Sequence, residues 1–561
     1  MMLFEKEVAK QIKRICPSAE ISLGTPPDPK MGDLAFPCFS LSRILKKAPA
    51  VIAADLAGKI KPGRFISGAT AEGAYLNFHI RRDVLAGHIL GEISSSGAEY
   101  GKGRAKRERI MVEFFHANTH KGVHVGHIRN MCLGESLSRI LVFSGYRVLR
   151  VNYQGDIGAH VTKCLWGLLN FKTKMPAKDR GVWLGEVYSR ANKKISGDDA
   201  LENEIQVMTK KLYSGDPRLT ALWKKTRKYC LDDFEDLYRE FGVNFDRLFF
   251  ESEVEKSGVR IAKELLKKKI AKISDGAIVI DLEKYGLAVF IILKSDGTAL
   301  YSTKDMALAK LKFEKYRIDR SIHVVGKEQE MYFKQLFKTF EMMGFRQAKK
   351  SYHLIYDLVM LPEGKMSSRE GNVVLYNELR NRLFESASGE VEKRHPDWSK
   401  RQKTLAASQI AFGALKFGML NRENNRIIMF DWDQALDFEG ETGPYVQYAH
   451  ARMCSILRRA GGRIGSIPDF SELSGDAEHS LLKLLMQFPG VAGQSSQQYK
   501  PHLVARYALE LAQQFNLFYH ACPILKEKRE KRDARLFLVQ CVRQVLESAL
   551  GLLGIEAPER M

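Results

Sequence analysis

The sequence lacks the long apolar runs of a membrane protein and the paired cysteines of a disulfide-rich or zinc-binding one. Its longest unbroken apolar run, Leu287 to Leu293, is far shorter than the roughly 20 residues that a membrane-spanning helix needs. The 8 cysteines are scattered and include no C-x-x-C pair, which argues against a cysteine-based zinc site and indicates reduced thiols. We therefore expect a cytoplasmic protein that makes no use of a membrane.

The first residues also lack the features of a targeting signal. Residues 1–16 contain Glu5 and Glu7 within an amphipathic pattern and have no apolar core followed by a cleavage site. Secretory signals require such a core, and mitochondrial presequences are poor in acidic residues. We expect a folded helix at this position.

The overall composition is that of a large globular protein. The 561 residues are 45% hydrophobic and 27% charged, which excludes a disordered or collagen-like chain. At about 150 residues per domain, this length predicts three or four domains.

The charge balance points to a polyanionic partner. The chain has 88 Lys and Arg against 66 Asp and Glu, a formal net charge of +22. Nucleic acid is the partner this charge favours, ahead of an anionic membrane surface; a generally basic proteome is the alternative. Basic runs lie at Lys102–Arg109, Arg218–Lys228 (with Trp223 and Tyr229) and Lys526–Arg535. Basic side chains among aromatic ones suit RNA, although each run alone also fits a solvated helix face.

The pattern of the first hundred residues predicts a small separate α/β unit. Helices are expected at 6–15 and 40–60, and a strand at 74–80. The Gly- and Ser-rich stretch 94–103 then becomes basic and is typical of a linker.

A larger unit with a parallel sheet is expected to follow. A strand at 109–115, a glycine-bearing turn, a helical pattern at 128–143 and a strand at 146–153 make a βαβ unit. This unit is the building block of a doubly wound parallel sheet. The lysine-rich stretch 165–265 has a helical pattern and is expected to be an insertion between the two halves of that sheet.

Strands are expected to resume after the insertion, and the end of the chain is expected to be helical. The predicted strands lie at 277–281, 287–293, 321–325 and 352–361. From residue 399 the pattern is helical, and a final all-helical domain begins near Gly443.

The most informative segment is Glu113–His127, EFFHANTHKGVHVGH, in which a strand ends, a loop follows and a helix begins. A helix N-terminus offers free N–H groups and a positive dipole end to phosphate. His124 and His127, three residues apart, can direct hydrogen bonds to the same anion, and Gly126 allows a flat base to approach the backbone. Metal binding is a weaker alternative because no carboxylate follows at zincin spacing. Ordinary surface histidines are another.

A second segment, Leu361–Gly371, has the sequence LPEGKMSSREG. Its glycines bracket Lys365, Ser367 and Ser368, and a basic loop of this kind can close over a polyphosphate. Alone, it would be only a flexible surface loop.

The two segments together resemble the HIGH and KMSKS signatures of class I aminoacyl-tRNA synthetases, and the whole chain resembles the arginyl-tRNA synthetase family. Further matching segments are Met31–Pro37, Gly155–Gly158, Ala299–Ala307, His323–Gln329 and Gly440–Arg452. The last of these and the signature pair are the most specific, and the N-terminal match is the weakest.

The resemblance implies a fold and a domain organisation. It implies a Rossmann-type doubly wound catalytic domain with a helical insertion, a small N-terminal α/β domain and an all-α anticodon-binding domain. The expected boundaries are 1–100 for the N-terminal domain, 108–400 for the catalytic domain with its insertion at about 165–265, 400–442 for stem helices, and 443–561 for the anticodon-binding domain.

The resemblance also implies which residues bind the substrates. A buried carboxylate can hold the planar, permanently charged guanidinium of arginine through two parallel hydrogen bonds. The implied arginine-binding residues are Glu113, Asn118, Tyr301, Asp305 and Gln329. From the residues alone, Asp305 would instead be an acid in the first turn of a helix whose N-cap is Thr303. Tyr301 alone would be a core residue.

The implied nucleotide and tRNA contacts form two further sets. The ATP-binding set is His124, Gly126, His127, Lys365, Met366, Ser367 and Ser368, and the catalytic set is Lys121, His124, His127 and Lys365. The tRNA-binding set, implied more weakly, is Asn77, Phe78, Tyr445 and Tyr448.

The resemblance implies arginine–tRNA ligase activity. Arginine would attack the α-phosphorus of ATP, accompanied by Mg²⁺, and the arginyl group would pass to tRNA(Arg). No tightly held protein metal site is expected, and a monomer is expected.

Two departures from the family pattern stand out. Ser368 occupies the place of the second signature lysine, and Lys121 stands where family members without that lysine often carry one. We hypothesise that Lys121 replaces its charge. The stretch His116–His120 replaces the small residues and proline that the family more often shows.

Three alternatives remain open at this point. Another class I synthetase, of the cysteinyl or class I lysyl type, is the first, although a cysteinyl enzyme would need zinc-binding cysteines. A catalytically silent tRNA-binding paralogue would be expected to have lost the signature residues, which are present here. A nucleotidyltransferase acting on a small molecule without RNA fits poorly with the basic charge and the helical C-terminal region.

Overall fold

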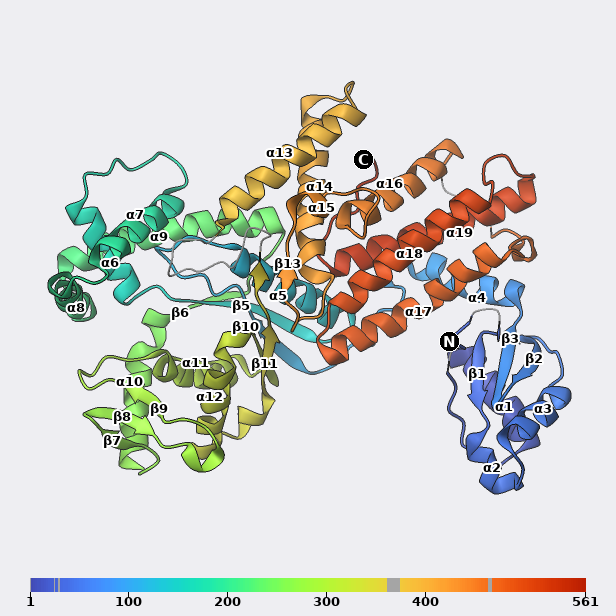
Figure 1. Ribbon diagram of the computed structural model, residues 1–561, viewed down its shortest axis with the longest axis horizontal. Helices are drawn as coiled ribbons and strands as arrows, with labels where there is room; N and C mark the ends of the chain where they lie inside the picture. The colour runs from blue at the N-terminus through green and yellow to red at the C-terminus, as the bar shows by residue number, and fades with distance from the viewer. Residues whose placement is uncertain (1, 25, 29–30, 361–373, 463–466) are drawn as a thin grey trace.

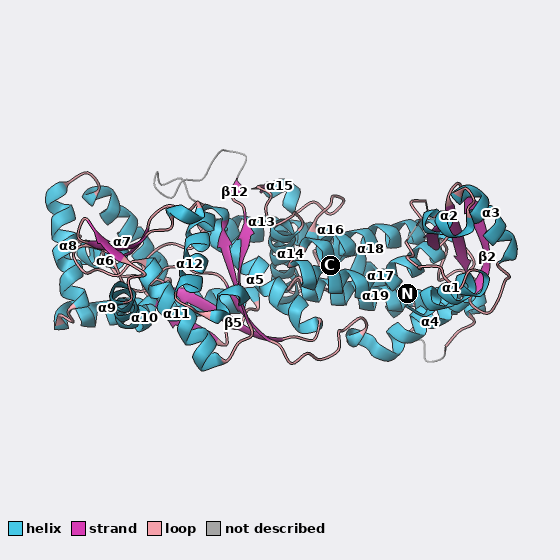
Figure 2. Cartoon of the chain, turned by 90° about the horizontal axis from the view of Figure 1, so that it is seen from below, coloured by secondary structure: helices cyan, strands magenta, loops and turns pink. Residues whose placement is uncertain are grey.

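The computed structural model describes residues 2–24, 26–28, 31–360, 374–462 and 467–561. The chain is elongated, with a small N-terminal domain at one end, a helical insertion at the other, and the parallel sheet and C-terminal helices between them (Figures 1 and 2). No helix in these ranges is both long and apolar enough to cross a bilayer.

The N-terminal domain packs helices against a three-stranded antiparallel sheet with the order β1-β3-β2. Pro49 starts a new helix because it needs no N–H partner in the first turn, so the helix expected at 40–60 is two helices. The expected linker is helical as far as Ser96. The elements are α1 (Met2–Ile15), β1 (Leu34–Pro37), α2 (Phe39–Leu45), α3 (Pro49–Lys59), β2 (Ile66–Glu72), β3 (Tyr75–Ile80) and α4 (Arg82–Ser96).

The catalytic region is built on a five-stranded, entirely parallel sheet with the order β11-β10-β4-β5-β6. The strands are β4 (Arg109–Glu113), β5 (Arg147–Gln154), β6 (Arg247–Phe250), β10 (Arg320–Gly326) and β11 (Ser351–Tyr356). The chain winds outward from β4 in one direction through β5 and β6, and from β10 in the other through β11. This arrangement confirms the expected Rossmann-type sheet and puts its switch point between β4 and β10.

Two expectations about strands are wrong. The stretch expected to be wholly helical contains β6, a strand of 4 residues. This strand gives little sequence signal because the long helices α9 (Pro217–Phe241) and α10 (Glu251–Lys267) flank it. Conversely, β8 (Ala277–Ile280) and β9 (Phe290–Leu293) do not join the parallel sheet. They form a separate antiparallel sheet with β7 (Lys272–Ser274).

The remaining elements are mostly helices that cover the parallel sheet or form the two helical regions. The insertion contains α6 (Ala159–Asn170), α7 (Arg180–Ile195) and α8 (Asp199–Tyr213) together with α9. Around the sheet lie α5 (Val125–Phe143), α11 (Tyr301–Tyr316), α12 (Glu330–Met342) and the short parallel pair β12 (Val359–Met360) and β13 (Ile428–Met429). The C-terminal region contains α13 (Tyr376–Arg394), α14 (Lys400–Leu420), α15 (Trp432–Ala435), α16 (Gly443–Arg459), α17 (Asp476–Gln498), α18 (His502–Ala521) and α19 (Arg529–Leu552).

A buried charge cluster joins the N-terminal domain to α17. The Asp33 carboxylate lies 2.8 Å from His479 Nε2 and 2.8 Å from Lys483 Nζ, and it accepts a hydrogen bond from the Ile80 backbone N–H. Burial alone would raise the pKa of Asp33, but the hydrogen bonds from His479 and Lys483 lower it to about 2. The N-terminal domain is therefore docked onto the C-terminal helices, as Figure 1 shows.

Candidate active site

A cavity of about 550 Å³ opens at the carboxyl ends of β4 and β10, at the switch point of the sheet. Segments that lie far apart in the sequence meet here, among them the loop after β4, the start of α11 and the loop after β10. Eight of the predicted site residues line this one cavity: Glu113, Asn118, His124, Gly126, His127, Tyr301, Asp305 and Gln329.

The helix α5 begins at this cavity, with His124 as its N-cap. His124 Nδ1 accepts the backbone N–H of Gly126 (3.1 Å), and His127 Nδ1 accepts the backbone N–H of His124 (3.2 Å). Both Nδ1 atoms are thus acceptors, so in the neutral rings the proton is on Nε2. A Cβ at Gly126 would lie 3.0 Å from the His124 ring, so the residue must be small here.

The two signature histidines are neutral near pH 7. Burial lowers the pKa of His124 to about 4, with a further contribution from Lys121. Burial also lowers the pKa of His127 well below its ordinary value, with His124 adding to the effect. The pair therefore offers two Nε2–H donors at the positive end of a helix, which is an arrangement suited to phosphate oxygens.

Asp305 presents an unpaired carboxylate oxygen to the cavity. Its Oδ2 accepts a hydrogen bond from the Tyr332 hydroxyl (2.5 Å), while its Oδ1 is buried and has no hydrogen-bond partner within the described ranges. Burial raises the pKa of this carboxyl to about 7, although the Tyr332 hydrogen bond acts in the opposite direction. Thr303 is not the N-cap of α11, which is Leu300; its hydroxyl accepts the Leu300 N–H and donates to the Ile292 carbonyl. Asp305 lies beyond the first turn of the helix and lines the cavity, so it is not a helix N-terminal acid.

Glu113 also lines the cavity, but its carboxylate already has internal partners. It is 3% exposed, forms an ion pair with Lys312, and lies 2.9 Å from His323 Nδ1. Burial alone would raise its pKa, but Lys312 and His323 lower it well below the ordinary value. Its negative charge is offset within the protein, whereas Asp305 Oδ1, on the same cavity, has neither a cation nor a hydrogen-bond donor in the described part of the chain.

Sequence reasoning missed several lining residues. Tyr153, at the end of β5, has a buried hydroxyl for which the described part of the chain offers no partner. Lys312 stands seven positions after Asp305 in α11. This spacing puts both residues on one face of the helix, so the sequence could have indicated that Lys312 also faces the site. Glu251 lines the cavity and forms a buried ion pair with Lys304 (2.5 Å), for which the sequence gave no signal.

A second cavity of about 800 Å³ adjoins the first and contains Lys121. Asn118, His124 and His127 line both cavities, so the two spaces share a wall. The Lys121 ammonium lies 5.2 Å from the centre of the Tyr188 ring, and burial lowers its pKa. Lys121 is therefore held beside the signature histidines, on the side that faces α7 and α9.

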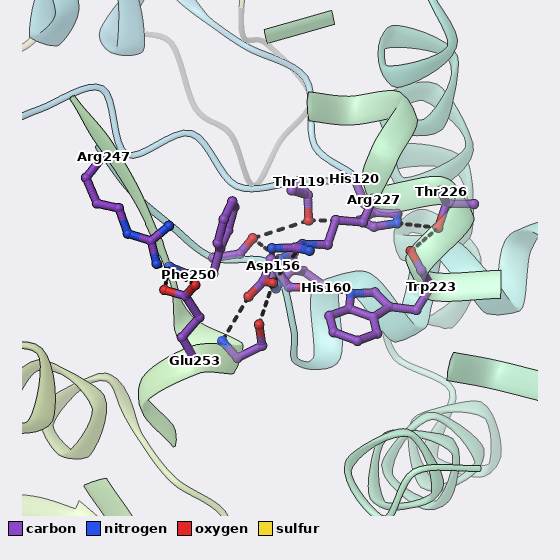
Figure 3. A network of polar contacts seen from close by, with 12 residues as sticks. Thr119, His120, Asp156, His160, Trp223, Thr226, Arg227, Arg247, Phe250 and Glu253 are labelled. Carbon is purple, nitrogen blue, oxygen red and sulfur yellow. Dashed lines mark hydrogen bonds and ion pairs between the residues drawn. The ribbon is translucent and has the colours of Figure 1, made fainter. Parts of the chain in front are cut away.

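A polar network holds the loop between β4 and α5, which carries Asn118 and Lys121, against α9 and the turn after β5 (Figure 3). The Asp156 carboxylate is buried, lies 2.9 Å from Arg227 Nε and accepts two hydrogen bonds from Ser252. His120 contacts the Thr226 hydroxyl (2.8 Å) through Nε2, so the loop is tied to α9. This network joins the signature loop, the turn after β5 and the helical insertion.

The second signature segment cannot be placed in the same way. Lys365, Met366, Ser367 and Ser368 lie outside the described residues. The residues on either side of the segment do lie at the site: Met360 lines the first cavity, and the Val374 carbonyl accepts a hydrogen bond from the Val125 N–H (3.3 Å).

Two of the four residues predicted to contact tRNA are buried in the N-terminal domain. Phe78 is 0% exposed because it faces the core of the N-terminal domain. Asn77 is on the opposite face of β3 but is only 2% exposed. Two residues that were not predicted are accessible on this domain: Tyr75 is 46% and Phe39 is 54% exposed, with their rings 5.7 Å apart.

A third cavity, of about 650 Å³, lies among the C-terminal helices. Tyr448, Arg452 and Tyr519 line it, and the Arg452 guanidinium lies 4.8 Å from the Tyr448 ring and 5.2 Å from the Tyr519 ring. The predicted residue Tyr445 is close by, with its hydroxyl accepting a hydrogen bond from Asn516 (2.9 Å).

Comparisons with known proteins match the whole chain in three parts. Residues 90–432 match the model "tRNA synthetases class I (R), catalytic domain". Residues 446–561 match "DALR anticodon binding domain", and residues 2–80 match "Arginyl tRNA synthetase N terminal domain". The first region contains the two adjoining cavities, the second contains most of the residues that line the C-terminal cavity, and the third contains the N-terminal sheet.

Full-length relatives give the same result. The chain is 36% identical to the arginine–tRNA ligase of Bdellovibrio bacteriovorus over 96% of this chain and 94% of the relative. It is 35% identical to that of Clostridium perfringens over 100% of both chains. The solved arginyl-tRNA synthetase of Thermus thermophilus superposes with a TM-score of 0.84 at 29% identity, covering 100% of both. That of Plasmodium falciparum, at 20% identity, has a TM-score of 0.78 over 100% of this chain and 99% of the other, a likeness of fold.

Proposed function

Because the chain belongs to the class I arginyl-tRNA synthetases, we propose that the cavity between β4 and β10 is where it joins arginine to AMP and then to tRNA(Arg). The observation that carries this proposal is the meeting of two features in one space. One is the unpaired carboxylate oxygen of Asp305, and the other is the pair of neutral histidines at the N-terminus of α5. The first suits a cationic amino acid and the second a phosphate.

The arginine side chain is proposed to occupy the part of the cavity around Asp305. A guanidinium there gives Oδ1 the partner it lacks and favours the ionised carboxylate. Tyr301, which is 61% exposed at the start of α11, packs over the guanidinium. Glu113, already paired with Lys312, closes the floor of the cavity. A neutral isostere would leave Asp305 buried and unpaired, which can yield discrimination on the order of 10⁴.

Adenylate formation is proposed to proceed by in-line displacement. Asn118 and Gln329 orient the α-amino and α-carboxyl groups. A carboxylate oxygen then attacks the α-phosphorus, and the bond between that phosphorus and the pyrophosphate oxygen breaks. The Nε2–H groups of His124 and His127 hold the oxygens on which charge develops, and Gly126 leaves room for adenine. Catalysis then consists of positioning and charge stabilisation.

The leaving pyrophosphate is proposed to meet the residues of the second signature segment, Lys365, Met366, Ser367 and Ser368. Mg²⁺ arrives with ATP as part of the substrate. Within the described ranges, no group of three or more His, Cys, Asp or Glu side chains could hold a metal ion. Substrate phosphates are themselves typical Mg²⁺ ligands.

Lys121 is proposed to supply the charge that Ser368 lacks. It stands beside His124 and His127, and the adjoining cavity lets its ammonium reach a phosphate. Lys121→Ala is expected to slow adenylate formation by about 100-fold, typical of losing one charged contact to a transition state, while arginine still binds. Near-normal adenylate formation in the variant would show that Lys121 has no such role.

Transfer RNA is proposed to contact both ends of the chain. In the C-terminal cavity, Tyr448, Tyr519 and Arg452 offer ring and guanidinium surfaces on which an unstacked anticodon base can lie. At the N-terminal domain, Tyr75 and Phe39 offer a similar surface. The net charge of +22 favours association with the phosphate backbone.

The domain boundaries, the oligomeric state and the location also stay proposals. We propose boundaries at residues 100, 108, 400 and 443, with stem helices at 400–442. The insertion, expected at 165–265, is proposed to end with α9 at Phe241, because the following strand β6 belongs to the parallel sheet. A monomer in the cytoplasm is proposed, and every one of the eight cysteines is a free thiol. Light scattering on the purified chain would measure its mass in solution.

The test of the proposed function is aminoacylation of tRNA(Arg) with arginine, lysine and cysteine in parallel, with ATP–pyrophosphate exchange for each amino acid in the presence and absence of tRNA. Arginine alone should be activated and transferred. Exchange with lysine or cysteine would indicate a different class I synthetase. Binding of tRNA without any exchange would indicate a paralogue that has lost catalysis.

A further inference from the structure

His116 lines the cavity between β4 and β10 but has no role in the steps above. Its Nε2 is buried and finds no hydrogen-bond partner in the described part of the chain. A buried polar atom without a partner destabilises the fold because it has lost its hydrogen bonds to water. Native structures rarely leave such atoms unpaired without a functional reason. The Nε2 therefore needs a partner that the ligand-free chain does not provide.

The backbone holds His116 in a conformation that side chains rarely adopt. Its φ is 54°, and that of Phe115 before it is 82°. Two side-chain amides lock this turn: Asn130 Oδ1 accepts the Phe115 N–H (2.6 Å), and Asn152 Oδ1 accepts the His116 N–H (3.1 Å). A strained backbone that its surroundings over-determine is typical of a functional position. The fold thus maintains a costly conformation that directs this imidazole into the cavity.

The ring of His116 is neutral and offers an acceptor. Burial lowers its pKa; Glu113 on β4 opposes this effect, and Lys312 on α11 adds to it. The backbone carbonyls of Tyr153 and Glu113 raise its pKa, the effect expected of carbonyls near a ring N–H. A neutral imidazole has one N–H and one acceptor nitrogen, and in the tautomer with its proton on Nδ1 the unpartnered Nε2 is the acceptor.

The position of His116 identifies the group that it would meet. It interacts electrostatically with Glu113 and Lys312 on one side and with His127 on the other. Tyr153, another lining residue with an unpartnered polar atom, has its strongest electrostatic interaction with Asp305 at the guanidinium end and a weaker one with Glu113. His116 therefore lies nearer the signature histidines, where the reacting end of the amino acid must be.

We propose that His116 Nε2 accepts a hydrogen bond from the α-ammonium group of arginine and is a specificity-determining residue of the site. This inference rests on the proposed function. Of the groups at the reacting end, the ammonium is the one that brings N–H donors, while the carboxylate brings acceptors only. His116 thus selects for an α-amino acid, whereas Asp305 selects for the guanidinium.

The test compares two substitutions that differ in where they place an acceptor. In His116→Gln, Oε1 stands as many bonds from Cα as Nε2 does in histidine, so the acceptor is retained. In His116→Asn, the amide ends at the level of Nδ1, so the acceptor is lost, although asparagine tolerates the left-handed backbone well. Calorimetry would measure binding to the full-length chain. The ligands are arginine, agmatine (which lacks the carboxylate) and the 2-hydroxy analogue (which lacks the ammonium).

His116→Asn is expected to weaken arginine and agmatine about 10-fold or more, the effect of losing a hydrogen bond to a charged group, and to leave the 2-hydroxy analogue within about 2-fold. His116→Gln is expected to recover most of the loss. The remote substitution His88→Asn, in α4, is the control and should change none of the three.

Equal weakening of all three ligands, or no weakening of arginine, would overturn the assignment of the ammonium to His116. Failure of His116→Gln to recover binding, in a variant that melts at the wild-type temperature, would overturn it as well. If the wild-type chain itself binds no arginine, the proposed function fails, and this inference fails with it.

Discussion

At the scale of single residues, the proposed site depends on one buried carboxylate that lacks a cation within the fold. Asp305 is buried with one oxygen unpaired, and its pKa is raised to about 7. Glu113, at the end of β4, lines the same cavity but is paired with Lys312 and has a lowered pKa. The two pKa values differ because the fold pairs Glu113 with a cation, while Asp305 has none and is proposed to receive one from the substrate.

The raised pKa of Asp305 predicts how arginine affinity changes with pH. Below pH 7 the free enzyme holds this carboxyl mainly protonated, and a guanidinium must displace that proton. Because the guanidinium itself stays charged, the dissociation constant for arginine should rise about 10-fold from pH 8 to pH 6. Calorimetric titration at several pH values measures this change, and a flat profile would contradict it.

Asp305→Asn tests the same carboxylate through stability. A raised pKa means that the folded chain holds this proton more tightly than the unfolded chain, so ionisation destabilises the fold as pH rises from about 4 to 7. The variant cannot ionise, so it should melt at a higher temperature than wild type at pH 8 and at a similar one at pH 4. It should also lose at least about 100-fold in arginine affinity. A lower melting temperature at pH 8 would mean that Asp305 stabilises the fold.

The residue types at the site could be predicted from the sequence, but their pairing could not. The order of His124, Gly126 and His127 after a strand was enough to predict an N-terminal phosphate site. The ion pair between Glu113 and Lys312 could not be foreseen, because it depends on how closely α11 packs against β4. The left-handed backbone at His116, whose Nε2 is left unpaired, could not be predicted from the sequence pattern either.

At the scale of elements, Arg129 connects α5 to the chain on either side of the second signature segment. It is 0% exposed, and its guanidinium donates to four backbone carbonyls. These carbonyls belong to Asp357, Leu358, Asn424 and Arg426, at distances of 2.5 to 2.9 Å. The helix that carries His124 and His127 is therefore fixed to the strand pair β12–β13, which leads to Lys365.

Arg129→Met should separate these elements. The methionine fills similar space but leaves four carbonyls without donors, so the free energy of unfolding should fall by about 3–5 kcal/mol. Adenylate formation should slow at least about 10-fold, because the residues before Lys365 lose their anchor, while arginine affinity stays within about 3-fold. Chemical denaturation and pyrophosphate exchange measure the two effects. Arg139→Met, on the same helix but partly exposed, is the control.

Long elements were predictable from the sequence, and short ones were not. The start of α11 at Tyr301 and of α16 at Gly443 matched their motifs. The strand β6 was missed because its 4 residues lie between two long helices. The apolar run ending at Leu293 was expected to be a strand that resumes the sheet after the insertion. In the structure Val289 and Ile291 are exposed, because one face of its small sheet meets solvent.

At the scale of the whole molecule, the C-terminal helices lie between the N-terminal domain and the catalytic domain, as Figure 2 also shows. The Asp33 cluster with His479 and Lys483 fixes the N-terminal domain to α17. An RNA that touches both the N-terminal domain and the active site must span this arrangement. The relative placement of the domains therefore bears on tRNA binding but not on arginine binding.

Asp33→Ala should affect the two substrates differently. Removing the carboxylate leaves His479 and Lys483 without their buried partner, so docking weakens by about 3–5 kcal/mol. The KM for tRNA is expected to rise about 10-fold or more, because the N-terminal contact is no longer pre-positioned, while arginine affinity does not change. Asp55→Ala removes an exposed ion pair on the same domain and should alter neither value. An unchanged KM for tRNA would show that docking does not serve tRNA binding.

We expect a single cavity to hold a guanidinium at Asp305 and a phosphate at the start of α5. A crystal structure of the enzyme with a non-hydrolysable arginyl-adenylate analogue would locate both groups. The guanidinium should lie within hydrogen-bond distance of Asp305 Oδ1, and the oxygens of the group that replaces the phosphate should lie within reach of His124 and His127 Nε2. An analogue bound with its guanidinium away from Asp305, or outside the space between β4 and β10, would show that this cavity does not hold both groups.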